Sequence, residues 1–337
     1  MTLKNTLIFV FVSIILIGCE NNPLLVNASD VQMDVDFTNI DDIIYYSDSS
    51  DLMKQYEELS KNKESILAYE IGRVLKIGRV SDTSFYNSIQ DFRADTSIQA
   101  LEKDLSRVIP LLIEKEDRII DGFRHLRYHF PEGNVPGSIA YLNGLFTTAM
   151  FSAEKEIGVG TEWYMGDTSS IVEQLNPQYF FGWMKEAMKM EYYERDVLTS
   201  WIETHYVNRV DGNIAEHMIR WGKVLYLVEA AFPEMDPRLI VRYTQENYKY
   251  AKENEESFWN YLVDEKLLFK IDERTTRNLI SEGPFTPGLP NQEAPDRYGQ
   301  FLGWRMVHQY MKKTETSVKN LIDIEYNDIL REYEIED

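Results

Sequence analysis

Histidine and glutamate side chains at helical spacing could bind zinc, so they are considered first. A zinc peptidase needs two imidazoles one helical turn apart with a glutamate beside the first, as in His-Glu-x-x-His. Of the five histidines, His125 and His129 have this spacing, but the glutamate is missing and arginines stand beside them. The pattern favours two histidines on a helix surface over a zinc site.

A second group of ionisable residues falls on a strongly patterned helix. Glu216 and His217 stand in the reverse of the zinc order, and Arg220 occupies the place of a second ligand. Because residues three and four apart share a helix face, Glu216, Arg220 and Lys223 should lie together. They form our candidate pocket, roofed by the loop at 282–295. A solvated, salt-bridged face is the alternative.

Motifs for other reactions are missing from the sequence. It has no Gly-x-Ser-x-Gly elbow for a serine nucleophile. Gly158-Val-Gly160 lacks the third glycine and the lysine of nucleotide loops. With 56 acidic residues, any one carboxylate pair is uninformative about glycoside hydrolysis. We therefore expect no catalytic residue, no metal ion and no cofactor.

Aromatic residues gather in the segment from Tyr179 to Trp183. With Trp163 and Trp201 they could form a platform on which a sugar stacks. Packing inside the fold is the use we favour, because aromatic side chains dominate cores.

The first nineteen residues have the pattern of an exported lipoprotein. Lys4 precedes an apolar run from Leu7 to Ile17, which is too short to span a bilayer as an anchor. Leu16-Ile17-Gly18-Cys19 fits the bacterial lipobox, in which the cysteine thiol is acylated and becomes the mature N-terminus. We expect a signal peptide at 1–18, a tether at 19–30 and one mainly helical globular domain at 31–337.

The net charge of the mature chain excludes some classes of binding partner. Without residues 1–18 it carries 34 Lys and Arg against 56 Asp and Glu, a net charge of −22. Such a chain should not bind nucleic acid or anionic lipid headgroups electrostatically. Two or more acyl chains on Cys19 would give stable membrane attachment. No other cysteine exists, so the fold has no disulfide and must rely on its core.

Hydrophobic periodicity predicts an α+β fold that is predominantly helical. Apolar and polar residues alternate over Val31–Phe37, which indicates a strand. Glycine-broken β-like runs between 137 and 167 complete a sheet of three or four strands. Between about 50 and 130 the pattern is helical, with Asp95 as a capping residue and Pro110 expected to kink or divide a helix.

The C-terminal half is expected to be almost entirely helical. The best helix follows Asn213 and stops at Phe232, and a long helical region covers 239–268 with an exposed acidic face at Glu253, Glu255 and Glu256. The proline-rich segment 282–295 must be a loop. The last strong helix is expected from Asp296 to Lys313.

Small residues on the last helix predict a close helix contact. Gly299 and Gly303 are four apart and leave a smooth strip where another backbone can approach. Gly222 could serve the central helix in the same way. Trp304 would then be a core anchor, as would Trp221 and Trp259.

Several blocks, in order, resemble the gliding-motility lipoprotein GldB family of Bacteroidetes. The resemblance covers about Val31 to Met311. The blocks are Phe130-Pro131 through Gly166, Met218-Ile-Arg-Trp-Gly222-Lys223-Val-Leu-Tyr226, Tyr250-Ala-Lys-Glu-Asn254-Glu-Glu-Ser-Phe-Trp259, Gly283-Pro-Phe285 and Arg297-Tyr-Gly299-Gln300-Phe-Leu-Gly303-Trp304.

The resemblance implies a lipoprotein required for gliding, associated with envelope machinery that overlaps type IX secretion, with no established reaction. Other proteins of that machinery would be its partners. Glu20-Asn21-Asn22 lacks the dense acidic run expected for surface display, which favours a periplasm-facing position. A fainter similarity to zincin-like peptidase folds leaves a degenerate or active metallopeptidase as one alternative. A solute- or glycan-binding lipoprotein is the other.

Overall fold

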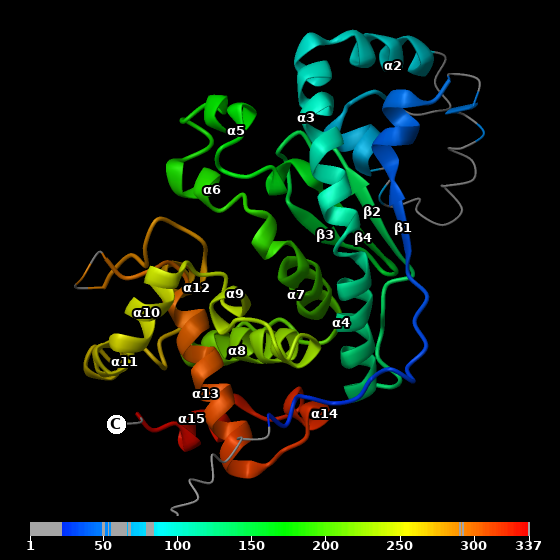
Figure 1. The fold of residues 1–337 in the computed structure, drawn as a ribbon. Helices are drawn as coiled ribbons and strands as arrows, with labels where there is room; N and C mark the ends of the chain where they lie inside the picture. Colours follow the sequence, from blue (N-terminus) through cyan, green and yellow to red (C-terminus); the bar gives the residue numbers. More distant parts are fainter. Residues whose placement is uncertain are drawn as a thin grey trace, which may run out of the picture.

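A computed structural model shows the fold (Figure 1). Cys19 and the expected signal peptide at 1–18 lie outside the described residues. The structure describes residues 22–48, 51–52, 54, 66, 69–78, 84–289, 291 and 293–335.

One mixed sheet joins the N-terminal third to the rest of the chain. Its strands are β1 (Asp36–Asn39), β2 (Ser138–Leu142), β3 (Met150–Ser152) and β4 (Glu156–Gly160), in the order β1-β2-β4-β3. The first three in that order are parallel, and β3 is antiparallel to β4. The predicted α+β class and the small sheet are confirmed. The first strand begins later than predicted, because its partner β2 starts only after Pro136, which lacks an N–H.

The two faces of β2 pack into different hydrophobic clusters. Ile139 and Tyr141 join the large core formed with the C-terminal helices. Ala140 and Leu142 join a smaller cluster with the N-terminal helical segments. This alternation is what a strand buried on both faces requires.

The N-terminal helical segments pack on both sides of the sheet: those before residue 95 contribute to the smaller cluster, and those from 108 to 129 contribute to the large core. Asp95 caps α3 by accepting hydrogen bonds from the N–H groups of Ser97 and Ile98, as predicted. Pro110 lies inside α3, which continues past it for less than one turn and ends at Ile113. The break between α3 and α4 therefore lies after the proline, and α4 begins at Glu116. The segments are the π-helical turns η1 (Asp42–Tyr46) and η2 (Glu70–Val74), and the helices α2 (Phe85–Ala94), α3 (Thr96–Ile113) and α4 (Glu116–His129).

After the sheet the described chain is almost entirely helical. The predicted central helix is α8, capped by the Asn213 side chain. The expected helical region over 239–268 is present as three helices, because Arg242 adopts a left-handed backbone (φ 60°) and Asn254 ends the second helix. The elements are η3 (Thr161–Tyr164), α5 (Ser170–Gln174), α6 (Gly182–Glu186), η4 (Met190–Tyr192), α7 (Tyr193–His205), α8 (Ile214–Ala231), α9 (Pro237–Ile240), α10 (Gln245–Glu253), α11 (Glu255–Asp264), α12 (Glu273–Ile280), α13 (Tyr298–Thr314), α14 (Val318–Leu321) and α15 (Tyr326–Glu332).

Helices α8 and α13 cross with their backbones almost in contact. A Cβ atom on Gly303 would lie 1.8 Å from the carbonyl oxygen of Met218, and one on Gly222 would lie 2.1 Å from the carbonyl oxygen of Gly303. Gly299 similarly faces the backbone of Leu279 in α12. The glycine strip read from the sequence is the seam between these helices.

The segment expected as a tether is packed against the fold where the structure describes it. The Leu24 side chain is only 3% exposed and belongs to the large core. The Asn22 amide donates a hydrogen bond of 3.0 Å to the Pro233 carbonyl, and Ala28 is also buried. Residues 22–30 therefore form part of the globular unit.

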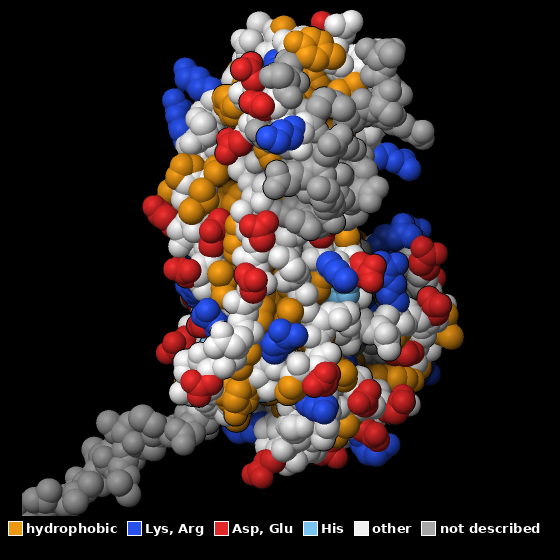
Figure 2. All heavy atoms as spheres, turned by 90° about the vertical axis from the view of Figure 1, so that its right-hand side faces the viewer, with side chains coloured by type: hydrophobic (Ala, Val, Ile, Leu, Met, Phe, Trp, Pro, Cys, Tyr) orange, Lys and Arg blue, Asp and Glu red, His pale blue; other side chains and the backbone are white. Residues whose placement is uncertain are grey.

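The molecular surface mixes charges of both signs. On the face in Figure 2, acidic side chains are spread among basic ones, with small apolar areas between them. Within the described ranges, none of the helices combines the length and apolar character needed to cross a bilayer.

The helix crossing makes a stability prediction. We expect Gly303→Ala to lower the free energy of unfolding by about 3 kcal/mol or more, because the backbones must separate. Gly182→Ala is the matched control, since a Cβ there meets nothing within 4 Å. Urea unfolding followed by tryptophan fluorescence measures both, and equal stability of the two variants would contradict the packing described.

Candidate functional site

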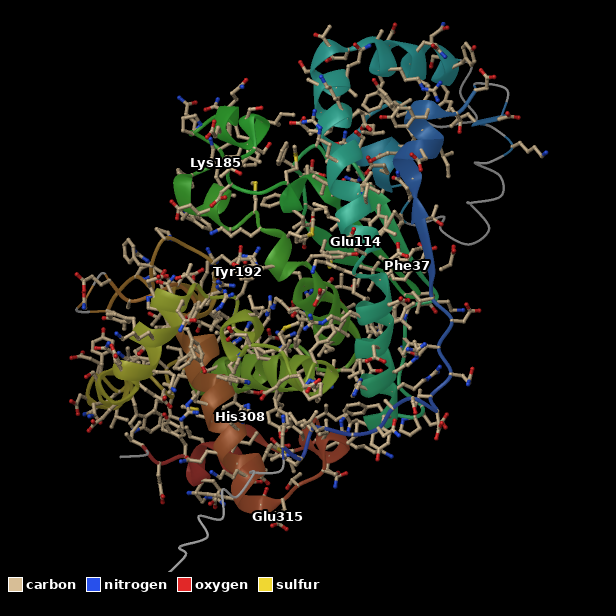
Figure 3. The ribbon with its side chains drawn as sticks, in the orientation of Figure 1. Phe37, Glu114, Lys185, Tyr192, His308 and Glu315 are labelled. Carbon is tan, nitrogen blue, oxygen red and sulfur yellow. The ribbon has the colours of Figure 1, made fainter. Side chains whose placement is uncertain are left out.

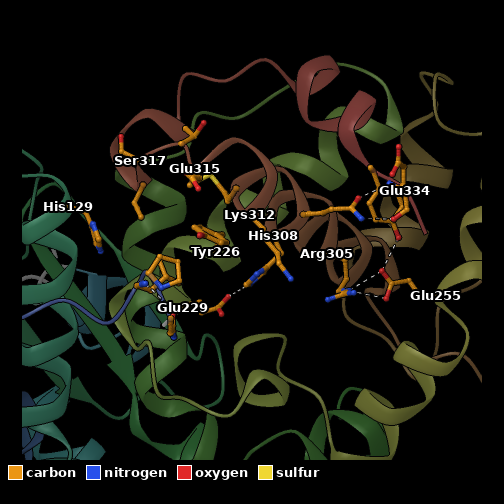
Figure 4. A pocket seen from close by; sticks show the side chains of 18 residues that line it. His129, Tyr226, Glu229, Glu255, Arg305, His308, Lys312, Glu315, Ser317 and Glu334 are labelled. Atoms are coloured by element: carbon orange, nitrogen blue, oxygen red, sulfur yellow. Dashed lines mark hydrogen bonds and ion pairs between the residues drawn. The ribbon is translucent and has the colours of Figure 1, made fainter. Parts of the chain in front are cut away.

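A cavity of about 920 Å³ lies where α8 and α13 meet both ends of the described chain (Figure 4). Its size is that of ordinary ligand pockets. The lining residues are Asn22, Pro23, Leu24, His129, Tyr226, Glu229, Glu255, Arg305, His308, Gln309, Met311, Lys312, Glu315, Thr316, Ser317, Val318, Tyr333 and Glu334. None of the predicted pocket residues is among them.

A carboxylate and an imidazole meet on one wall of this cavity. Glu229 of α8 accepts a hydrogen bond of 3.0 Å from the Trp304 indole through Oε2, and the same oxygen contacts Nε2 of His308. The rings of Trp304 and Tyr226 pack edge-on against His308, with centroids 4.7 and 5.0 Å away. The imidazole is therefore held in one orientation. A carboxylate–histidine pair is the orienting half of many general bases.

An ion pair forms another wall. Arg305 Nε lies 3.0 Å from both carboxylate oxygens of Glu255, and the Tyr333 hydroxyl donates to the same carboxylate at 2.9 Å. Burial, and then the charge of Glu255, raise the pKa of Tyr333, so its hydroxyl stays protonated and donates. The sequence placed Glu255 on an exposed acidic face. That prediction holds for Glu253 and Glu256, which are exposed, but it is wrong for Glu255, whose side chain is only 14% exposed.

His125 and His129, which have zinc-ligand spacing in the sequence, lie in different environments. His129 faces the cavity, and burial lowers its pKa to about 4, with a further contribution from His125. His125 Nδ1 lies 2.9 Å from the main-chain oxygen of Asp121. Across the described part of the chain, no three or more His, Cys, Asp or Glu side chains are grouped so as to hold a metal ion.

Of the candidate residues Glu216, Arg220 and Lys223, the two cations are buried against separate segments of the chain. Arg220 is buried, and its guanidinium donates to the main-chain oxygen of Asn208 at 3.0 Å and to the Glu203 carboxylate at 3.3 Å. The ammonium of Lys223 is also buried.

Lys223 serves a different segment of the chain. It donates to the main-chain oxygens of Ile322 and Ile324 at 3.2 and 2.5 Å. Arg220 therefore binds the carbonyl of one connecting segment, at Asn208, and Lys223 binds the carbonyls of another, at Ile322 and Ile324. Because Arg220 and Lys223 are buried, the alternative of a solvated face is wrong, whereas a pocket shared with Glu216 stays a prediction.

The loop at 282–295 is held by a buried arginine network instead of roofing that helix. The guanidinium groups of Arg242 and Arg297 approach the Glu282 carboxylate at 3.4 and 3.5 Å. Arg297 also pairs with Asp296 at 2.9 Å, and Arg242 with Asp196 at 3.3 Å. The loop is therefore ordered by charge pairs beneath it.

The aromatic segment does not form one platform. Trp201 is fully buried in the core, whereas Tyr179 and Phe181 are 71% and 53% exposed. Phe181 and Trp183 face Phe285 across a groove of about 480 Å³. Trp201 and the exposed rings are thus in different environments, and the sugar platform including Trp201 is excluded.

Buried carboxyl groups at the end of the parallel strands form a feature that the sequence analysis missed. Asp41 follows β1, Glu162 follows β4, and Glu102 comes from α3; each is at most 3% exposed. The Asn143 amide after β2 donates to Glu102 at 2.8 Å, and its N–H donates to Asp41 at 3.0 Å. No sequence pattern marks them, because they come from separate segments.

Glu162 fixes the loop that follows β2. Its carboxylate accepts hydrogen bonds from the N–H groups of Gly144 and Phe146 at 3.1 and 2.7 Å. Leu145 and Phe146 both have a left-handed backbone, which these bonds hold in place. Burial raises the pKa of Glu162 to about 7 despite these hydrogen bonds.

Glu70 is the least compensated member of this group. It is fully buried, and neither carboxylate oxygen has a hydrogen-bond partner. Burial, followed by the charge of Asp41, raises its pKa well above the usual value. Burial therefore disfavours the charged form of Glu70.

Comparison with known proteins identifies the family of this chain. The family model described as Gliding motility protein GldB matches residues 21–334. The chain belongs to the GldB family, as its sequence blocks indicate. No curated protein and no solved structure matches the chain.

Glu70 makes a pH-dependent prediction. A carboxyl whose pKa is raised on folding contributes stability below its unfolded pKa of about 4.3 and loses it as the pH rises. Glu70→Gln should therefore be more stable than the wild type at about pH 8, by about 1–3 kcal/mol, with a smaller gap at about pH 5.5. Urea unfolding at both pH values measures this. The exposed Glu132→Gln should change neither, and a destabilised Glu70→Gln at the higher pH would contradict an unpaired carboxylate.

Lys223 makes a second prediction. We expect Lys223→Met to lower the free energy of unfolding by about 1–3 kcal/mol, because two partly buried carbonyls lose their donor. Hydrogen exchange should increase first in the segment around Ile322. Lys103→Met, on the exposed face of α3, is the control. Unchanged exchange near Ile322 would show that Lys223 does not hold this segment.

Proposed function

We propose that the protein is a membrane-anchored, non-catalytic component or assembly factor of the gliding motility and type IX secretion machinery. The observation that carries this proposal is the family match over residues 21–334, which includes every helix and strand described above. Acyl chains on Cys19 would hold the protein at the cell envelope. The domain faces the periplasm and works through contacts with other envelope proteins.

The use of the charged side chains supports a role without catalysis. Arg220, which stands where a second zinc ligand would be, binds a main-chain carbonyl, and so does Lys223 on the same helix. In the main cavity, Arg305 is engaged in an ion pair with Glu255. Stoichiometric zinc in protein purified without added metal would contradict this part of the proposal.

The cavity favours a second candidate function, the binding of a solute. Its volume of about 920 Å³ would admit a small molecule, and Tyr226, Met311 and Val318 give it apolar surface. In this version the protein recognises a ligand of the envelope and still performs no reaction.

Deletion and replacement of the gene test the proposed function. We expect a clean deletion in the source bacterium to abolish colony spreading or adhesin export, and the wild-type gene to restore it. Cys19→Ser, exported but not acylated, should fail to restore spreading, because one acyl-bearing residue supplies the anchor. Asn21→Ser keeps the lipobox and is the control. Normal spreading of the deletion strain would refute the role, whereas full rescue by Cys19→Ser would refute the anchor.

A further inference from the structure

The chain is fixed to the fold almost from the point at which the lipid would be attached. Asn22 donates to the Pro233 carbonyl through its amide, and its Oδ1 accepts the N–H of Leu24 at 3.0 Å. Leu24 inserts into the core. Asn22, Pro23 and Leu24 also line the main cavity.

Chain length then limits how far this cavity can be from the membrane. Only Glu20 and Asn21 separate Cys19 from Asn22. Three trans peptide steps of about 3.8 Å span at most about 11 Å. We infer that the end of the molecule formed by Asn22–Leu24, the C-terminal end of α13 and the start of α14 rests on the lipid bilayer, with the main cavity opening next to it. This inference rests on the proposed acylation of Cys19.

The side chains at this end of the molecule fit attachment to the bilayer through acyl chains and not through basic residues. Leu25, beside the docked segment, is 55% exposed and offers an apolar side chain to the interface. Lys313 is paired with Glu334 at 3.3 Å. With a net charge of −22 on the mature chain, attraction to anionic headgroups would contribute little.

The opposite end is left for protein partners. In Figure 3, His308 and Glu315 lie towards one end of the molecule and Lys185 of α6 lies towards the other. The exposed Phe181 and its groove belong to the part of the chain around α6. The bilayer therefore occupies the cavity end, and α6 points into the periplasm.

Single-cysteine labelling tests this orientation, because Cys19 is the sole cysteine and acylation would consume it. Ser317→Cys places a fluorophore at the cavity rim, and Glu186→Cys is the matched exposed position on α6. The acylated full chain is reconstituted into phosphatidylethanolamine–phosphatidylglycerol vesicles that contain a headgroup-labelled quencher lipid. We expect several-fold stronger quenching at position 317 than at position 186.

A linker variant shows whether the short attachment is the cause. A 12-residue Gly-Ser insertion between Asn21 and Asn22 adds a span of about 19 Å and should bring quenching at position 317 down towards that at 186. Equal quenching at the two positions in protein that floats with the vesicles would overturn the orientation while leaving the anchor intact. Failure of the acylated preparation to float would overturn the anchor, and this inference with it.

Discussion

The near-contact of α8 and α13 at Gly222 and Gly303 is the constraint on which the rest of the structure depends. Side chains on neighbouring turns can reach across only because these backbones touch. Glu229 meets Trp304 and His308 on the far side of the crossing. A wider crossing would remove the buried hydrogen bond and reshape the cavity wall together. Packing and the candidate site are thus set by the same two residues.

Charged groups inside the fold mostly stabilise connections between elements. Arg220 and Lys223 bind carbonyls at the ends of segments, and Arg242 and Arg297 hold the proline-rich loop through Glu282. Such buried groups are costly unless they are paired. Both Glu70 oxygens lack a hydrogen-bond partner among the described residues, and burial raises the pKa of this carboxyl well above its usual value.

The sequence predicted those features that depend on local patterns. The cap at Asp95, the three strands between 138 and 160 and the glycine strip around Gly303 all follow from residue type and spacing. The cavity could not be predicted, because its walls come from both ends of the described chain and from five helices, α4, α8, α11, α13 and α14. Periodicity placed Arg220 and Lys223 on one helix face, but it could not show that each reaches a different loop. The break at Arg242 arises from a left-handed backbone that its residue type does not require.

The docked N-terminal segment also bears on how long the protein would stay at the membrane. Proteases cleave where several consecutive residues leave the folded surface. Between Cys19 and the first docked residue the chain offers only Glu20 and Asn21, since Leu24 is already inserted in the core. Shedding of the domain from its anchor would first require residues 22–30 to detach. The same packing that shortens the attachment therefore protects it from proteolytic release.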